Sequence, residues 1–291
     1  MKKLSNKKLN SKVDIDQLLL NTGDMALKRR ARAIVVELDP QNGERILDVG
    51  CGDGYYLYLL SSLGLRLKLY GVDFDKQALA TASYNLAGKK ITLKTASLMD
   101  RLPFEDNYFD KIVMSEVAEH LPDDKKGLKE VFRVLKKGGV LALTVPHHNY
   151  PLFWDPLNWV LERTFNTHVK SGFWAGIWNQ HIRLYYREEI VKVLKKSGFE
   201  IVKSEVQTKW CLPFNHQVIN LGARMLKSKV LPEDLSTQIN KFKKYNQKKR
   251  SNLVKLYYGI SNFADHFNNN INTIVETVGM TVFVLAKKPK H

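Results

Sequence analysis

Residues 45–54 have the sequence RILDVGCGDG, and this segment determines the fold we expect. A short apolar run is followed by three glycines in alternate positions, Gly50, Gly52 and Gly54. Glycine is needed where the backbone turns sharply and approaches a ligand without an intervening Cβ. A helix expected from residue 55 would direct unpaired N–H groups and its positive dipole end toward that ligand. The segment therefore predicts a strand, a glycine turn and a helix that together can hold a negatively charged group.

Short apolar runs alternate with helical patterns from residue 45 onward. Strands that alternate with helices are joined by right-handed crossovers, so the pattern predicts a parallel sheet with helices on both faces. Gly138 and Gly139 are expected to cap the C-terminus of the helix over 125–137. The expected fold class is α/β with a doubly wound sheet. We expect strands over 45–51, 68–73, 91–97, 109–117, 139–146, 199–206 and 279–288, and helices over 55–63, 75–87, 125–137 and 187–197.

The pattern also divides the chain into segments. Residues 1–44 are expected to form a basic helical segment, and residues 45–206 together with 279–291 the α/β domain. Within that domain, residues 147–180 are irregular and rich in aromatic side chains, which suits a cap over a substrate. Residues 207–278 are expected to be a mostly helical insertion before the last strand.

Apolar side chains recur at three- and four-residue spacings within the insertion. Such a stripe predicts an amphipathic helix, and we expect it to pack against the protein rather than to form a groove for a partner. The stripe consists of Ile239, Phe242, Leu253, Tyr257, Ile260, Phe263 and Phe267.

The charge is strongly positive, with 46 Lys and Arg against 29 Asp and Glu and a formal net charge of +17. This excess suits contact with nucleic acid or an anionic membrane, but solvated helix faces explain it equally simply. Two cysteines, Cys51 and Cys211, cannot supply a disulfide framework, which favours a reducing cytoplasm. No stretch approaches the roughly 20 apolar residues of a membrane span. We expect a cytoplasmic, soluble protein that can associate peripherally with a membrane.

Asp73 closes the second expected strand. A carboxylate at that point can accept hydrogen bonds from both hydroxyls of a ribose. The dinucleotide fingerprint would place a third glycine where Tyr55 stands, and no Walker-type Gly-Lys pair follows. The spacing therefore favours a nucleoside ligand other than NAD.

These motifs resemble those of the class I S-adenosylmethionine-dependent methyltransferases, in particular the small-molecule enzymes related to quinone-biosynthesis O-methyltransferases. LDVGCGDG (47–54) is similar to the first motif of that family and VDFD (72–75) to the second. The resemblance implies a Rossmann-like sheet of seven strands with the last strand antiparallel, and S-adenosylmethionine as cofactor. It continues through LPFEDNYFDKIV (102–113), SEVAEHL (115–121), FRVLKKGGVLALTVP (132–146), HIRLYYREEIVKVLKKSGFE (181–200) and MTVFVLAKKP (280–289).

The resemblance also implies which residues hold the cofactor. Gly50 and Gly52 would pass beneath its methionine part, with Asp48 near the amino group. Asp73 would hold the ribose, and Phe74 would pack on the adenine.

The far end of the cofactor is less completely matched. Ser115, at the end of the fourth strand, would line the pocket beside the sulfonium. The family often has an aspartate after the third strand that meets the adenine amino group, but this chain has ASLMD at 96–100. Ser97, Asp100 or the main chain would take that role, and Leu98 would line the pocket.

Histidines follow the fourth and fifth strands, where ligands of open α/β folds bind. A histidine titrates near neutrality, as a general base must. His120 is the residue that we favour as the catalytic base. Glu116 and Glu119 are expected to orient a histidine or an acceptor hydroxyl. The other candidate bases are His147, His148 and His181, the last followed by Arg183 and Tyr185 in alternation.

The expected reaction is O-methylation of a small or amphiphilic acceptor beneath the aromatic cap, although the same aromatic residues could form only a local hydrophobic core. A nucleic-acid methyltransferase is the first alternative, favoured by charge. The Asn/Asp-Pro-Pro-aromatic motif of base-amino methylation does not follow the fourth strand, where Ser115 stands. A non-catalytic cofactor-binding scaffold is the second alternative, and an NAD-dependent enzyme a weaker third. The sequence determines neither the acceptor nor the oligomeric state, and it shows no metal-binding motif.

Overall fold

A computed structural model describes residues 13–211, 221, 240–243, 251–270 and 277–290 of the 291-residue chain. Its strands are β1 (Arg45–Val49), β2 (Lys68–Asp73), β3 (Ile91–Thr95), β4 (Phe109–Ser115), β5 (Leu135–Pro146), β6 (Glu200–Gln207) and β7 (Thr281–Lys287). Its α-helices are α1 (Ile15–Leu18), α2 (Met25–Leu38), α3 (Tyr55–Ser61), α4 (Lys76–Asn85), α5 (Asp124–Val134), α6 (Pro156–Phe165), α7 (Arg187–Lys196) and α10 (Asn252–Asn270). Short 3₁₀ helices are η1 (Leu19–Asn21), η2 (Ala118–His120) and η3 (Phe173–Trp178).

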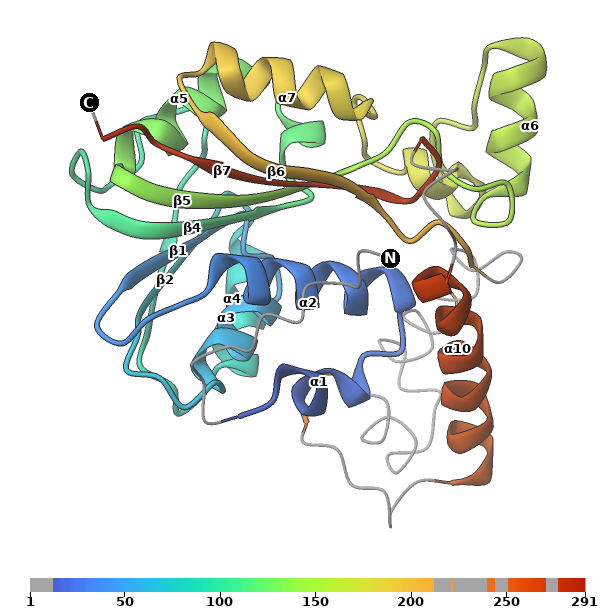
Figure 1. Ribbon diagram of the computed structural model, residues 1–291, viewed down its shortest axis with the longest axis horizontal. Coiled ribbons are helices and arrows are strands. Elements are labelled where there is room, and N and C mark those ends of the chain that lie inside the picture. Colours follow the sequence, from blue (N-terminus) through green and yellow to red (C-terminus); the bar gives the residue numbers. More distant parts are fainter. Residues whose placement is uncertain (1–12, 212–220, 222–239, 244–250, 271–276, 291) are drawn as a thin grey trace.

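The strands form one seven-stranded sheet in the order β3-β2-β1-β4-β5-β7-β6. Strand β7 is antiparallel to its neighbours β5 and β6, whereas β1 to β5 pair in parallel. In Figure 1, α5 and α7 cover one face of the sheet and α2, α3 and α4 the other. The α/β doubly wound class with an antiparallel last strand is therefore confirmed, and most elements lie close to their expected bounds.

One boundary was predicted wrongly. The helix expected over 125–137 ends at Val134, and the chain enters β5 at once, with Leu135 paired to Phe109 of β4. Leu135 is fully buried in the sheet, so extended backbone gives it both a ladder partner and a place in the core. Gly138, with φ +76°, lies in an irregular stretch of β5 rather than capping a helix.

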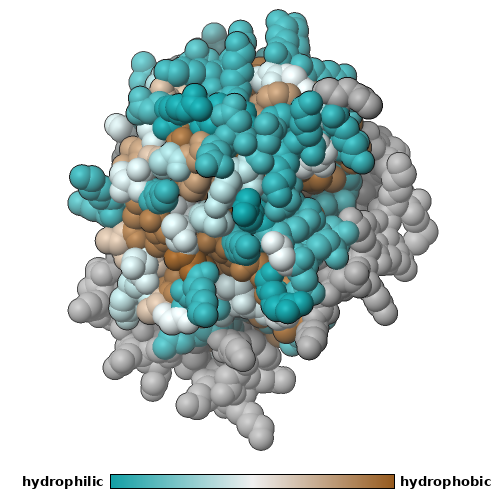
Figure 2. All heavy atoms as spheres, turned by 90° about the vertical axis from the view of Figure 1, so that its left-hand side faces the viewer, coloured by the Kyte–Doolittle hydropathy of each residue, from teal (hydrophilic) through white to brown (hydrophobic). Residues whose placement is uncertain are grey.

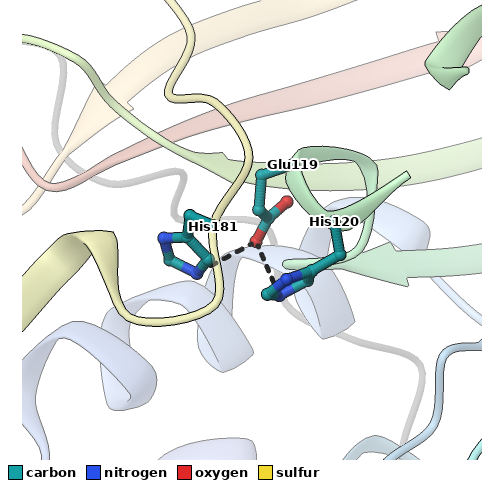
Figure 3. A group of neighbouring side chains, drawn as sticks. All are labelled: Glu119, His120 and His181. Carbon is teal, nitrogen blue, oxygen red and sulfur yellow. Dashed lines mark ion pairs between the residues drawn. The ribbon is translucent and has the colours of Figure 1, made fainter. Parts of the chain in front are cut away.

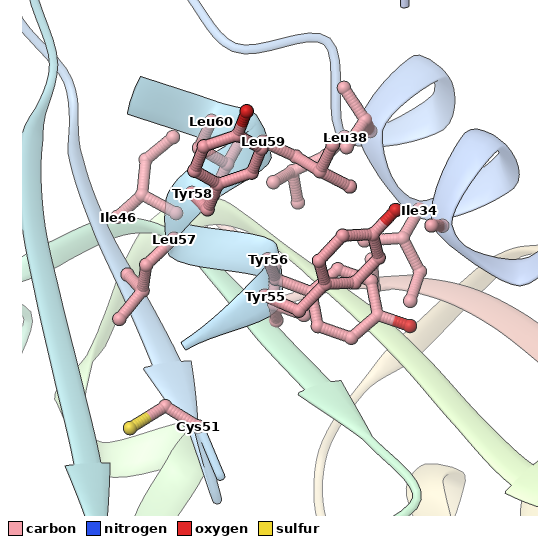
Figure 4. Close-up of a cluster of buried hydrophobic side chains, with 14 of the residues drawn as sticks. Ile34, Leu38, Ile46, Cys51, Tyr55, Tyr56, Leu57, Tyr58, Leu59 and Leu60 are labelled. Atoms are coloured by element: carbon pink, nitrogen blue, oxygen red, sulfur yellow. The ribbon is translucent and has the colours of Figure 1, made fainter. Parts of the chain in front are cut away.

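A dense apolar layer lies between α2, α3 and the sheet (Figure 4). Ile34 and Leu38 of α2 meet Leu57 of α3 and Ile46 of β1, and all four are at most 1% exposed. Burying each such side chain contributes roughly 1.5–3 kcal/mol. Cys51 is buried in the same layer, and burial raises the pKa of its thiol. The layer fixes the start of α3, and with it the glycine turn.

The expected burial of the apolar stripe on α10 is wrong for the side chains of Tyr257, Ile260 and Phe263, which are exposed. The helix instead buries Val254 and Tyr258 on its opposite face. Burial of this face is favoured because it also satisfies polar groups. The Tyr258 hydroxyl donates a hydrogen bond to a main-chain carbonyl before α2, 2.9 Å away, and an aspartate of α10 pairs with an arginine of α2.

The remaining stripe residues differ from one another. Phe242 packs edge-on against Tyr55 and Tyr58 of α3, as expected, with ring centroids 5.8 and 5.4 Å apart. Phe267 is partly exposed beside Trp210. Ile239 lies outside the described residues, as does the Leu253 side chain.

Figure 2 views the molecule from the side away from α6, and this face is mainly hydrophilic, with hydrophobic side chains exposed between the polar ones. Such a surface agrees with the large positive charge of the chain. Within the described ranges, no helix has both the length and the apolar character to cross a membrane.

Candidate functional site

The order of the strands places the site. The connections run in opposite directions from β1 and β4, which are neighbours, so a crevice opens outside their carboxyl ends. The carboxyl ends of β1 to β4 lie at this edge. The residues predicted to hold the cofactor lie in the last residues of these strands or on the loops that follow them.

The glycine turn after β1 is shaped by positive φ angles, +66° at Gly50 and +52° at Gly52. A Cβ at Gly50 would lie 2.5 Å from Cγ2 of Val117, so this glycine lets the turn pack against the loop after β4. A Cβ at Gly52 would meet nothing within 4 Å. The turn therefore closes on the protein at one glycine and leaves open space for a ligand at the other.

Asp73, at the end of β2, is tied to this turn. Its Oδ2 accepts a hydrogen bond from the N–H of Gly52 at 2.9 Å, and its Oδ1 accepts one from Asp75 at 3.0 Å. Each carboxylate oxygen retains a further lone pair. The arrangement holds the carboxylate rigidly at the mouth of the crevice, where it can accept hydrogen bonds from a pair of hydroxyls.

Asp48 lies deeper, at 1% exposure. Its Oδ2 has no hydrogen-bond partner among the described residues. Burial raises the pKa of this carboxyl well above its usual range, and the charges of Asp73 and Asp53 add to the effect. A buried carboxyl without a donor suits an ammonium group, such as that of an amino-acid tail, and its position therefore fits the role that the resemblance implies.

The residues predicted to hold an adenine differ in their exposure and in their hydrogen bonds. The Phe74 ring is 75% exposed directly after β2, available for stacking. The Ser97 hydroxyl accepts a local hydrogen bond from Met99 at 3.0 Å, while the Asp100 side chain is exposed. Leu98 is buried in the core.

Ser115 connects the crevice to side chains that sequence reasoning missed. Its Oγ lies 2.9 Å from the Tyr56 hydroxyl and 2.8 Å from Oγ1 of Thr144. Beside it, Arg30 of α2 pairs with Glu116 at 2.9 Å. An arginine from residues 1–44 therefore reaches the site, and no local signal in the sequence indicates this.

Two of the candidate histidines converge on one carboxylate (Figure 3). Nε2 of His120 lies 3.8 Å from Oε1 of Glu119, and Nε2 of His181 lies 3.9 Å from the same atom. The main-chain N–H of Ile182 donates to the Glu119 carbonyl at 3.1 Å, which clamps the loop that carries His181 onto η2. Among the described residues, these three side chains lie close enough together to hold a metal ion.

The other two candidate bases do not join this group. His147 is 2% exposed and bonded to the Gly279 carbonyl at 3.1 Å, and burial lowers its pKa. His148 stacks on Tyr186 with ring centroids 4.6 Å apart. The Tyr185 hydroxyl donates to an aspartate of α5. Of the predicted bases, His120 and His181 are thus the pair that the fold brings together.

The aromatic segment forms both a small core and an exposed surface. Tyr150 and Trp154 are buried with Ile177 in a third apolar cluster. Phe165 and Trp174, in contrast, are more than half exposed.

A hollow of about 460 Å³ lies between this segment and the loop that carries Tyr186. A second hollow, of about 500 Å³, lies beside α5 and away from the glycine turn. Its walls are Leu98, Met99, Asp100, Arg101, Lys126, Lys129, Glu130 and Arg133.

These features define a class of protein: a doubly wound α/β domain whose crevice suits a ligand with a ribose, an adenine and an amino-acid tail. Residues 47–143 match the family described as "Methyltransferase domain". Residues 47–143 are thus a methyltransferase domain, in agreement with the resemblance to the class I enzymes and with S-adenosylmethionine as the cofactor.

Curated proteins that are similar to the chain are methyltransferases by name. The chain is 31% identical over 174 residues to 2-methyl-6-phytyl-1,4-hydroquinone methyltransferase 2 of Oryza sativa subsp. japonica, which is 57% of this chain and 42% of the relative. It is 28% identical over 172 residues to demethylmenaquinone methyltransferase of Alkalihalophilus pseudofirmus, which is 56% of this chain and 72% of the relative. The chain thus spans less than half of the length of the rice protein.

Solved structures show the same fold at lower identity. Phosphoethanolamine N-methyltransferase 2 of Haemonchus contortus, in complex with S-adenosyl-L-methionine, has a TM-score of 0.52 and 20% identity, covering 95% of this chain and 60% of that one. The cyclase SpnF has a TM-score of 0.54 and 18% identity, covering 90% and 82%. Because a methyltransferase and a cyclase share the fold, activity must be argued from the site.

Proposed function

We propose that this protein transfers the methyl group of S-adenosylmethionine to an oxygen of a small amphiphilic acceptor of the hydroquinone or phenol type. The observation that carries the proposal is the meeting, at one edge of the sheet, of a crevice that suits the cofactor and a group of basic side chains after β4. Relatives named for hydroquinone and menaquinone methylation support the acceptor class.

The residues of the crevice would act by positioning. When bound, S-adenosylmethionine supplies a methyl group on a sulfonium, which leaves as a thioether when an acceptor oxygen attacks. Asp73 would hold the ribose and Asp48 the ammonium group, which fixes the methyl group near Ser115. Correct placement of the two reactants can contribute about 7–11 kcal/mol to the barrier reduction.

The loop after β4 would handle the proton of the acceptor hydroxyl. His120, whose ring is held by a hydrogen bond to a main-chain carbonyl, would accept that proton as the oxygen forms its bond to the methyl group. General-base catalysis of this kind contributes typically about 10²–10⁴-fold in rate. Glu119 lies beside both histidine rings and would orient them.

The cap explains the amphiphilic character that we propose for the acceptor. Its exposed side chains Phe153, Leu157 and Val160 are apolar and lie before or on α6, with Arg163 on the same helix. Exposed apolar side chains beside cationic ones suit a lipid tail and peripheral contact with an anionic membrane. Sedimentation with anionic vesicles at low and high salt tests this contact, and neutral vesicles are the control.

Transfer of label tests the reaction. The protein is incubated with methyl-labelled S-adenosylmethionine and, in parallel, with a prenylated hydroquinone, its short soluble analogue, RNA and DNA. We expect label in the two quinols, and NMR of the product places the methyl group on oxygen or on carbon. Label in nucleic acid alone would instead support the nucleic-acid alternative. Tight binding of S-adenosylhomocysteine without transfer to any fraction would support a scaffold.

A further inference from the structure

We propose that Glu119, His120 and His181 bind one divalent transition-metal ion of the zinc type, whose open coordination positions hold the acceptor oxygen. One ligand atom from each side chain lies within 4.8 Å of the other two, and Figure 3 shows both imidazole rings facing the carboxylate. The metal site itself stands on this geometry, whereas its role toward the acceptor rests on the proposed function.

The spacing of the three side chains suits a shared ion better than direct hydrogen bonds. The two distances from Oε1 of Glu119 to the histidine Nε2 atoms, 3.8 and 3.9 Å, exceed the hydrogen-bond range. Two ligand atoms bound roughly 2.0–2.2 Å from a tetrahedral zinc ion lie roughly 3.3–3.6 Å apart. A small contraction around an ion would therefore satisfy all three ligands.

The tautomer of His120 points to the same conclusion. Its Nδ1 lies 2.9 Å from the carbonyl oxygen of Gln180, which can only accept, so Nδ1 carries the proton. In the neutral ring, Nε2 then directs a lone pair toward the Glu119 carboxylate. A metal ion between these two electron pairs would bind both of them. A histidine that donates its other N–H to a main-chain carbonyl is the usual arrangement around a metal.

The surroundings of Glu119 also favour a bound cation. This side chain is fully buried, and neither of its oxygens has a hydrogen-bond partner in the described part of the chain. Oε1 of the neighbouring Glu116 likewise lacks one, because Arg30 pairs with Oε2. One fully buried and one partly buried carboxyl group thus lie near one guanidinium, and a cation bound at Glu119 would supply the partner that its oxygens lack.

Two residues with positive φ angles lie on the loops that carry the three side chains. Glu116 has a φ of +55°, a conformation that a residue with a side chain rarely adopts, and it turns the chain from β4 into η2. Gln180, on the facing loop, also has a positive φ, +67°. Gln180 directly precedes His181, and Glu116 is three residues before Glu119, so both positions shape the loops that carry the proposed ligands.

The ligand set selects the class of ion. Two imidazole nitrogens and one carboxylate oxygen suit Zn²⁺ or a similar transition metal, whereas Mg²⁺ and Ca²⁺ prefer oxygen ligands throughout. Three protein ligands leave a coordination position for a substrate oxygen. With the ion bound, His120 would be a ligand and would no longer act as the general base. An acceptor hydroxyl at the open position would lose its proton to solvent more readily, and its oxygen would then take the methyl group from the sulfonium, which leaves as a thioether.

The site lies close to the cofactor crevice. Val117, next to the metal-binding group in sequence, packs against the glycine turn at Gly50. An oxygen held by the ion would therefore lie on the acceptor side of the crevice, across from the residues that hold the cofactor.

Metal binding is measured on the full-length protein after chelator treatment, by titration with Zn²⁺ against a chromophoric chelator and with Co²⁺ by visible absorption. We expect one ion per chain, a Co²⁺ spectrum that changes when catechol is added, and no competition from a similar concentration of Mg²⁺. Substitutions H181Q and E119Q should abolish this binding. The control H148Q, a histidine at the same edge outside the group, should bind as the wild type does.

Folding and cofactor binding are followed in every variant by circular dichroism and by affinity for S-adenosylhomocysteine, which should not change. Thermal stability gives an independent measurement: Zn²⁺ should raise the melting temperature of the wild type and of H148Q but not of E119Q. The inference is overturned if the wild type binds no ion, if H181Q and E119Q bind it equally well, or if catechol leaves the Co²⁺ spectrum unchanged. The proposed function would survive any of these results, because it fails only when methyl label enters no quinol.

Discussion

The crevice around the glycine turn and the loop after β4 lie at the same edge of the sheet but are built differently. Around the turn, main-chain N–H groups and a neighbouring strand end define the geometry, and the key carboxylate, Asp73, already has two donors. After β4, the key carboxylate, Glu119, has none, and its neighbours come from distant segments. The first carboxylate is held by local backbone, whereas the second is a buried carboxyl group without a hydrogen-bond donor among the described residues. The comparison suggests a region for a common cofactor and a region for a particular acceptor.

The strongest test of the first region is Asp73→Ala. This change removes two charge-assisted hydrogen bonds to the ribose, each contributing about 1.5–3 kcal/mol. We expect affinity for S-adenosylhomocysteine, measured by calorimetry, to fall about 10²–10⁴-fold. The control is Asp75→Ala, which removes the N-cap of α4 and costs about 1 kcal/mol of stability, without loss of affinity. Equal affinities for wild type and Asp73→Ala would contradict the assignment.

Gly50→Ala tests whether the two regions depend on each other. The added methyl group imposes strain at φ +66° and meets the side chain of Val117, so we expect a loss of about 2–5 kcal/mol in denaturant unfolding. Gly88→Ala, also at positive φ but with nothing within 4 Å, should cost only about 1–2 kcal/mol. Combining Gly50→Ala with Val117→Ala should recover part of the difference. Equal losses of unfolding free energy at the two glycines would show that the contact between Gly50 and Val117 does not contribute to stability.

Substitution of the buried Asp48 should have opposite effects on the stability of the protein and on its affinity for the cofactor. Its pKa is raised in the folded protein, so the cofactor-free protein loses stability as pH rises from the unfolded pKa, about 3.9, up to the folded value. The loss amounts to about 1.4 kcal/mol for each unit between the two values. Asp48→Asn should remove this dependence, so the variant becomes more stable than the wild type toward neutral pH while binding S-adenosylmethionine more weakly. Parallel pH dependences of unfolding for the two proteins would disprove the effect.

The smallest effect concerns the cap. Val160 is exposed on α6, so Val160→Ser should change stability by no more than about 0.5 kcal/mol. We expect it to raise KM for a prenylated quinol by a few fold and to leave KM for the short soluble analogue unchanged. The buried counterpart Trp154→Ala should cost about 3–5 kcal/mol in unfolding, which confirms that the measurement detects packing. A uniform change in KM for both quinols would argue against an apolar contact at α6.

Much of the first region was accessible from the sequence. Glycine spacing, the strand-end position of Asp73 and the alternation of strands and helices are all local signals, and each follows from backbone geometry that few residue types can adopt. The error at Val134 arose because a helical periodicity continued into residues that the sheet recruits as β5. The error on α10 arose because two faces of one helix are apolar, and only contacts with α2 decide which is buried.

The sequence by itself determined the order of the elements, the α/β class and the glycine turn, because periodicity and the conformational freedom of glycine act over a few neighbouring residues. Only the tertiary structure brought His181 to Glu119, and Arg30 to Glu116, from segments far apart along the chain. Spacing along a chain does not encode such meetings, since packing of helices on the sheet and the crossing of loops at its edge bring those side chains together. The grouping of side chains after β4 was therefore decided by the fold.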